Sequence, residues 1–262
     1  MMRITRIYFW DNLRMFSKQA STKKIGAREG FHWRGQEVSR LEGLSDAVFA
    51  FAVTLLIVST EVPKTYNELI LKLRDFAPFA ACFAQLMAVW YRHYQYHRRY
   101  GLQDMTTIVL TLALLFVILF YTYPLKFVFM AMWANLIGQD ISGMFNNNYA
   151  QVSELFTIYA VGFIAVYLIF VWMYVHAYRQ RKELKLTELE LWDTKHELRE
   201  MIMFCGVGLI SLTLANVLPS ADAGYAGIAY SLLGVVGGVH GTWSGNRRNK
   251  IHAMLYPAVT ST

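Results

Sequence analysis

Charged side chains open one apolar stretch of this sequence. The stretch RLEGLSDAVFAFAVTLLIVST, residues 40–60, carries Arg40, Glu42 and Asp46 in its first half and continues as an apolar run. On a helix, Glu42 and Asp46 share a face and repel each other modestly. An acid near a membrane boundary is costly unless it is paired or hydrated. The pattern favours a structural network of ion pairs and hydrogen bonds. A proton relay, which would give these residues a functional role, is the alternative.

The cations that can pair with Asp46 lie at the end of a second apolar run, in the sequence WYRHYQYHRRY. If the two runs form an antiparallel helical hairpin, Arg92, His93 and Arg98 come level with Asp46, and Arg40 joins them. We therefore predict one network at this end of the hairpin, formed by Arg40, Ser45, Asp46, Arg92 and His93.

The sequence carries no motif of an enzyme active site. It has no glycine-rich phosphate loop, no serine nucleophile elbow and no Cys/His spacing of a zinc site. His93 and His97 are four residues apart, a spacing that a metal ion can use. However, arginines surround this pair, and no acid supplies the glutamate of a zinc protease. We predict neither an enzyme nor a metal or cofactor site.

The apolar half of the stretch forms a face of its own. At about 100° per residue on a helix, one stripe contains Ala47, Phe51, Leu55 and Val58, with Thr54 at its edge. By the same geometry Asp46 points roughly 140° away from the stripe. Taken alone, such a stripe is typical of a surface that faces lipid or the protein core.

The composition indicates that the elements positioning these residues are membrane helices. Only 16% of the 262 residues are charged, against about 25% in soluble domains. A spanning helix needs about 20 apolar residues. Six apolar runs approach or exceed that length, near residues 43–60, 76–97, 106–133, 155–178, 201–218 and 223–243. Within the third run, Pro124 is expected to kink the helix or to unwind its outer end.

The connections between the runs set the orientation. Residues 1–40 hold nine Lys or Arg and residues 179–200 hold six, whereas residues 134–154 and 219–224 hold none. The positive-inside rule then places both termini in the cytoplasm. Because the basic residues lie between apolar runs, the net charge of +7 indicates membrane lipid as a partner and not nucleic acid. We predict an all-α integral membrane protein with six transmembrane helices.

The chain divides into three segments. Residues 1–38 form a basic cytoplasmic N-terminal segment, residues 39–246 the six-helix transmembrane domain and residues 247–262 a short cytoplasmic tail. The N-terminal segment is interpreted as an amphipathic helix on the inner leaflet, or as a disordered basic arm. The charged stretch 179–200 is expected to extend the fourth helix into the cytosol.

A short motif at the start of the first run resembles a known family. The pattern R-x3-L-S-D-x3-A, followed by TLLIV and EVP, stands at Arg40, Leu44, Ser45, Asp46 and Ala50. It resembles the prokaryotic members of the transmembrane protein 175 family, relatives of the lysosomal potassium channel. Their first helix carries Arg-x3-Phe-Ser-Asp, and Leu44 here replaces the Phe. The resemblance in topology covers about residues 38–245 and implies a homotetrameric, potassium-permeable cation channel of the cell membrane.

The resemblance also implies that four first helices line a central pore with a hydrophobic constriction. Carried over by position, the constriction begins at Phe51, continues at Thr54 or Leu55 and ends at Val58. Apolar rings gate by dewetting and favour the ion that loses water more easily, so weak selectivity for potassium over sodium is expected. Phe51 stands where Ile or Leu is commoner, which leaves the pore diameter open. A proton- or cation-coupled transporter is the alternative, although its polar candidates are scattered over separate runs, at Gln85, Thr111, Asn216 and His240.

Overall fold

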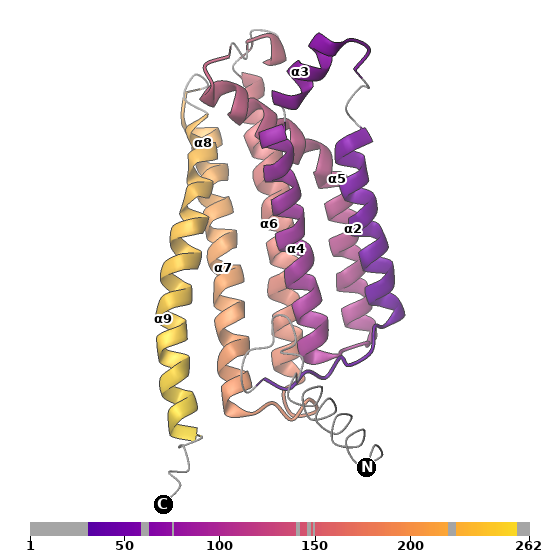
Figure 1. Cartoon of the computed structure of the whole chain (residues 1–262). Coiled ribbons are helices and arrows are strands. Elements are labelled where there is room, and N and C mark those ends of the chain that lie inside the picture. Colours follow the sequence, from indigo (N-terminus) through magenta and orange to yellow (C-terminus); the bar gives the residue numbers. More distant parts are fainter. Residues whose placement is uncertain are drawn as a thin grey trace, which may run out of the picture.

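Long helices standing side by side make up most of the molecule (Figure 1). This computed structural model describes residues 31–58, 63–74, 76–139, 142–145, 148, 150–219 and 224–255. The long helices are α2 (Arg40–Val58), α4 (Phe76–Tyr100), α5 (Met105–Leu136), α6 (Ala150–Arg179), α7 (Glu188–Val217) and α9 (Leu232–Leu255). The connections hold the short helices α3 (Tyr66–Arg74), η1 (Ser142–Phe145), α8 (Tyr225–Ile228) and η3 (Ala229–Ser231). Within the described ranges there is no strand.

The bundle has two distinct edges. At one edge α2 packs on α4 and α5, and at the opposite edge α9 packs on α7, with α6 contacting both α5 and α7 between them (Figure 1). The start of α2 and the end of α9 lie at the same end of the bundle, which we call the inner end (Figure 1). The opposite end is the outer end.

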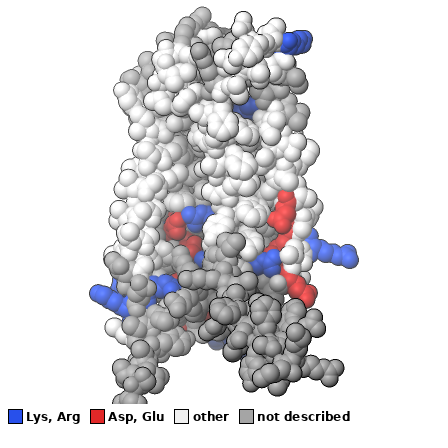
Figure 2. Space-filling view, viewed as in Figure 1, with Lys and Arg blue, Asp and Glu red and all other residues white. Residues whose placement is uncertain are grey.

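The surface chemistry fits a membrane-embedded chain. α5, α6 and α7 are long and apolar enough to cross a membrane, judged by length and composition. On the face drawn in Figure 2, most charged side chains gather near the inner end, and the surface above them carries few charges. Such an uncharged band is what a bilayer core about 30 Å thick requires.

Capping residues fix where two of these helices begin. The Asp104 carboxylate accepts a hydrogen bond from the backbone N–H of Thr107 at 3.2 Å, at the start of α5. Thr187 and Glu190 form a capping box, in which each side chain accepts from the other residue's backbone N–H. α7 therefore begins at a position set by its own sequence.

Pro124 lies inside α5 without ending it, so the outer end does not unwind there. A proline removes one intrahelical hydrogen bond. The neighbouring side chain of Leu125 is fully buried, and Tyr121 is nearly so. Packing on α4 and α6 thus holds the helix through the missing bond.

The inner end of the bundle is held by ion pairs to α7. The guanidinium of Arg99 on α4 lies 2.9 Å from the Glu197 carboxylate, and both side chains are almost fully buried. Arg248 on α9 pairs with Asp193 at 3.0 Å. A buried pair is retained only where each charge is compensated by its partner, so these contacts fix the register of α7 against its neighbours.

The segment before α2 differs from the expected amphipathic helix. Residues 31–39 contain no helix and cross the inner end with a bend at Glu37 (Figure 1). Their backbone groups bond to α4 and α7, as described below, and a helix would bond those groups internally. Residues 1–30 of the predicted N-terminal segment lie outside the described residues.

Two expected boundaries also move. α6 ends at Arg179, and turns over residues 180–185 lead toward α7. Most of the charged stretch 179–200 therefore belongs to the start of α7 and does not extend α6, the fourth long helix. The capping box at Thr187 explains this, because it starts a new helix there. α9 continues to Leu255, so the domain boundary expected at residue 246 falls inside a helix.

Candidate pore helix

The two sides of α2 have different surroundings. One side is buried against α4 and α5 and consists of Glu42, Ser45, Phe49, Ala52 and Leu56. On the other side Ala47 and Thr54 are exposed, and Phe51 has 56% of its surface exposed. Ala47, Phe51 and Thr54 of the predicted stripe therefore lie on the side of α2 that faces away from the rest of the bundle.

Two of the predicted constriction residues, Phe51 and Thr54, lie on this exposed side. Leu55 is half-buried at its edge, and Val58 is the last residue of α2, with a side chain outside the described atoms. The Thr54 hydroxyl donates to the carbonyl of Ala50 at 2.9 Å. Its proton is used within the helix, and its oxygen lone pairs stay available to a neighbour. Ile57, 56% exposed, shares this side and was missed, although it follows Thr54 by one helical turn.

The expected hairpin of α2 and α4 is present, but its polar contacts differ from those predicted. The indole N–H of Trp90 donates to the Asp46 carboxylate at 2.8 Å. The hydroxyl of Ser45 donates to the Leu41 carbonyl at 2.8 Å, within α2. Asp46 thus contacts a neutral indole of α4. The prediction missed this partner because tryptophan was counted as an apolar residue, although its indole N–H is a hydrogen-bond donor.

The predicted cations serve other partners. Arg92 turns to α7, where its guanidinium lies 2.6 Å from Glu200 and 5.0 Å from the ring centroid of Phe204. Arg40 is exposed at the start of α2. The five residues expected in one network therefore fall into separate contacts, because α7, which is distant in sequence, supplies acids that a reading of two helices could not include.

The two histidines of α4 form a buried pair. Their Nε2 atoms are 3.0 Å apart, so one ring nitrogen donates and the other accepts. The ring of His93 also lies against Phe49, with centroids 6.2 Å apart, which connects the pair to the buried side of α2. Among the described residues no group of three or more His, Cys, Asp or Glu is placed to hold a metal ion. His93 thus packs the hairpin.

Each end of α2 is held by a contact that the sequence reading missed. At the inner end, Ser39 and Glu42 form reciprocal bonds, from the Ser39 N–H to the carboxylate at 3.0 Å and from the Glu42 N–H to the hydroxyl at 3.2 Å. This S-x-x-E pattern is a capping box and was readable in the sequence. At the outer end, the Lys126 ammonium donates to the Leu56 carbonyl at 3.0 Å.

Lys126 is the one charged residue in the sequence of α5. The last four carbonyls of a helix have no intrahelical donor, and a cation at a helix C-terminus also interacts favourably with the helix dipole. The position of Lys126 as a single charge within an apolar run could have identified it as a contact residue, because charged residues in such runs usually have a functional partner.

Comparison with known proteins connects this helix to a family. The family described as the endosomal/lysosomal potassium channel TMEM175 matches residues 40–124, a range that begins with α2 and ends within α5. A protein named potassium channel from Marivirga tractuosa is 38% identical over 203 residues, which cover 74% of this chain and 81% of that protein. The chain belongs to the TMEM175 potassium channel family. The family resemblance seen in the first-helix motif is thereby confirmed.

Solved TMEM175 structures have the same architecture. The crystal structure of a single-residue variant of the potassium channel MtTMEM175, in complex with a nanobody–MBP fusion protein, matches with a TM-score of 0.74 and 34% identity. That match covers 84% of this chain and 99% of the solved chain. A lysosomal potassium-selective channel TMEM175 homolog from Chamaesiphon minutus matches with a TM-score of 0.52 at 19% identity, which concerns the fold. The described helices thus have the fold of TMEM175 channels.

Proposed function

We propose that four copies of this TMEM175 chain form a potassium-permeable cation channel whose pore is lined by α2. The observation that carries the proposal is the two-sidedness of α2, which buries Phe49 against its own subunit and leaves Phe51 56% exposed. An apolar side that packs on nothing in its own subunit needs lipid, another subunit or a pore. The family membership and the position of α2 at one edge of the bundle favour the pore (Figure 1).

The proposed constriction consists of stacked rings. Phe51, Thr54 with Leu55, and Val58 repeat at intervals of three and four, so each helical turn contributes one ring of four side chains. Apolar rings offer a passing ion no ligands, so the cost of removing water dominates the barrier. Potassium holds its water less tightly than sodium, and the channel should therefore favour potassium by a modest factor. The Thr54 hydroxyl oxygen is the single polar atom that this stripe offers to a partly hydrated ion.

The contacts at both ends of α2 hold this helix against its own bundle. The Trp90–Asp46 hydrogen bond and the capping box of Glu42 fix its inner half. Lys126 binds the Leu56 carbonyl next to the outermost ring. We place the channel in the cell membrane with six spanning helices and both termini in the cytoplasm, because the basic connections alternate with uncharged ones along the sequence.

Single-channel recording of the purified protein in lipid bilayers tests this function. Replacing Phe51 or Leu55 with Asn should wet the constriction, raise the unitary conductance and bring the potassium-to-sodium permeability ratio toward one. Leu209→Asn is the matched control, because Leu209 is 53% exposed on α7, and α7 packs on α6 and α9. Its ratio should equal that of the wild type.

Two results would contradict the proposal. If the Phe51 and Leu55 variants assemble and conduct with unchanged current and ion ratio, α2 does not line the pore. If potassium flux saturates and depends on a second ion without resolvable unitary currents, the protein is a coupled transporter.

A further inference from the structure

The segment before α2 is attached to the inner end of the bundle along its length. We call residues 31–39 the strap. Phe31 is buried, with its ring edge-on to Tyr100 at 6.0 Å and beneath the Arg99 guanidinium at 5.5 Å. The strap ends at Ser39, whose side chain caps α2. Only the three exposed residues 36–38 join Gly35 to this cap, so a large displacement of α2 pulls on the strap.

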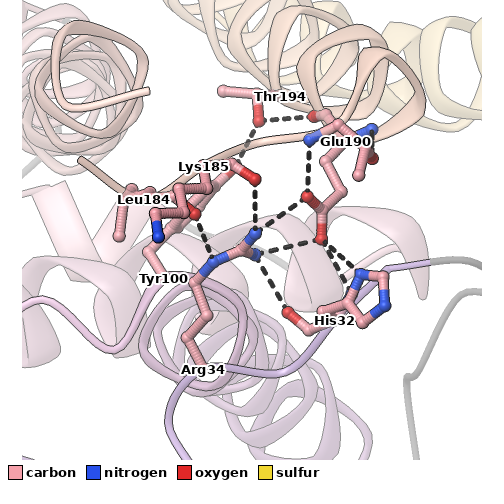
Figure 3. Close-up of polar contacts among 8 residues, drawn as sticks. His32, Arg34, Tyr100, Leu184, Lys185, Glu190 and Thr194 are labelled. Atoms are coloured by element: carbon pink, nitrogen blue, oxygen red, sulfur yellow. Dashed lines mark hydrogen bonds and ion pairs between the residues drawn. The ribbon is translucent and has the colours of Figure 1, made fainter. Parts of the chain in front are cut away.

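One arginine makes the strongest contact of the strap. The two terminal nitrogens of Arg34 lie 3.0 and 2.8 Å from the two carboxylate oxygens of Glu190, and its Nε donates to the Leu184 carbonyl at 2.9 Å (Figure 3). The Glu190 side chain is fully buried. This paired geometry requires the planar fork of a guanidinium, which lysine lacks. We call the Arg34–Glu190 contact the latch.

The buried carboxylate of the latch depends on the strap for its partners. Besides Arg34, it accepts a hydrogen bond from the backbone N–H of His32 at 2.8 Å (Figure 3). A further donor is the N–H of Thr187, which belongs to the cap of α7. Removal of the strap would leave Glu190 with only part of its hydrogen bonds, and this cost favours the docked state.

The strap also pairs with the end of α4. The Gly35 N–H donates to the Arg98 carbonyl at 3.2 Å, and the Arg98 guanidinium donates back to the Gly35 carbonyl at 3.0 Å. A Cβ atom at Gly35 would lie 2.5 Å from the His97 carbonyl oxygen, so the close approach requires glycine. The same Arg98 side chain pairs with Glu42 in the first turn of α2 at 3.3 Å. One arginine therefore bonds to both the strap and the pore helix.

We propose that the latch makes Arg34 a positioning residue for the pore helix, and that docking of the strap sets the open probability of the channel. The proposal rests on the proposed function, in which α2 lines the pore. The strap ties the inner end of α2 to α7, a helix with which α2 has few direct contacts. When the strap is docked, its contacts limit how far the inner end of α2 can move. When it is undocked, the inner end of α2 is held by α4 and α5 alone.

The effect of the latch should be separable from permeation through the constriction. Phe51 lies eleven residues after Arg40, which places its ring about 16 Å further along the helix axis. A change at the strap should thus alter how often the pore is open while leaving the rings and their spacing unchanged. Variants of the latch should shift the open probability, and variants of the stripe should shift the conductance and the ion ratio.

The test uses full-length channels with Arg34→Lys, Arg34→Ala and the double change Arg34→Ala with Glu190→Gln. The double variant removes both charges, so no unpaired buried carboxylate prevents folding. Glu37→Ala is the control, because Glu37 is an exposed strap residue. Hydrogen exchange of the Gly35 amide should be fastest in Arg34→Ala, slower in Arg34→Lys and slowest in the control. Single-channel recording should show at least a threefold change in open probability in the same order, with wild-type conductance and ion ratio.

Each outcome decides one question. If exchange of the strap accelerates but the open probability stays that of the control, the latch only docks the segment and the inference fails, while the channel function stands. If the strap exchanges as in the wild type in all three variants, the latch does not hold it, and the inference fails as well. The proposed function itself fails separately, when Phe51→Asn leaves conductance and ion ratio unchanged.

Discussion

Removing the Trp90–Asp46 hydrogen bond should lower the stability of the assembled channel without changing its ion selectivity. The bond joins an indole N–H to a carboxylate at 2.8 Å, and Asp46 is exposed. If Asp46 were paired with a buried cation, as the sequence predicts, losing one partner would cost about 3–5 kcal/mol of folding stability. A hydrogen bond to a charged group is worth about 1.5–3 kcal/mol, and exposure of Asp46 places this one at the lower end.

The size of the effect can be stated for the variants Asp46→Ala and Trp90→Phe. Each should cost about 1.5–2 kcal/mol, because each removes the bond, and Asp46→Asn should cost about half as much because the amide oxygen still accepts. For a chain of this size, each kcal/mol of lost stability lowers the melting temperature by roughly 2–4 °C. The melting temperature should therefore fall by about 3–8 °C in Asp46→Ala and in Trp90→Phe.

A double-mutant cycle followed by size exclusion at increasing temperature measures this bond. Combining Asp46→Ala with Trp90→Phe should cost less than the sum of the single changes, with an interaction of about 1 kcal/mol or more. The potassium-to-sodium ratio from bi-ionic reversal potentials should stay that of the wild type in all variants. Strictly additive costs would mean that the bond contributes nothing, and an altered ion ratio at an unchanged melting temperature would place Asp46 on the ion pathway.

Three further predictions concern the stripe, the outer end and the topology. Thr54→Ala should change the ion ratio while costing at most about 0.5 kcal/mol of stability, because the side chain is exposed and bonds only within its helix; an unchanged ratio would remove the hydroxyl from the pathway. Lys126→Met should lower the ion ratio, since the Leu56 carbonyl loses its donor, while Lys126→Arg should keep it; equal ratios in the two variants would show that the bond does not position α2. A cysteine placed at Asn148 should react with an impermeant reagent added outside intact cells, and one in the C-terminal tail should not; the reverse pattern would overturn the orientation.

The helical elements were predictable because apolar length and periodicity are local properties of a sequence. Each apolar run contributes to one long helix. The first run forms α2, on which both Phe51 and Asp46 are exposed and Asp46 accepts a hydrogen bond from Trp90 of α4. Contacts with distant helices were not predictable from single segments. Arg92 bonds to Glu200, 108 residues later, and no local pattern specifies that pairing.

The strap illustrates the same limit. An amphipathic helix was predicted for the whole segment 1–38, and within the strap the backbone N–H groups of His32 and Gly35 instead bond to acceptors on α7 and α4. Tertiary contacts can override a local preference when they provide partners for the backbone N–H and C=O groups. By contrast, the capping box at Ser39 and the isolated Lys126 were local signals that a closer reading of the sequence would have included.

The latch also has a consequence for how the chain is made. Arg34 and Glu190 are 156 residues apart. Translation at about 5–20 residues per second needs roughly 8–30 s to produce the chain between them. α2 therefore leaves the ribosome long before the carboxylate that anchors its inner end exists, and the strap docks only after α7 has been made. A nascent chain stopped between Val58 and Glu190 would carry a complete α2 with its strap unattached.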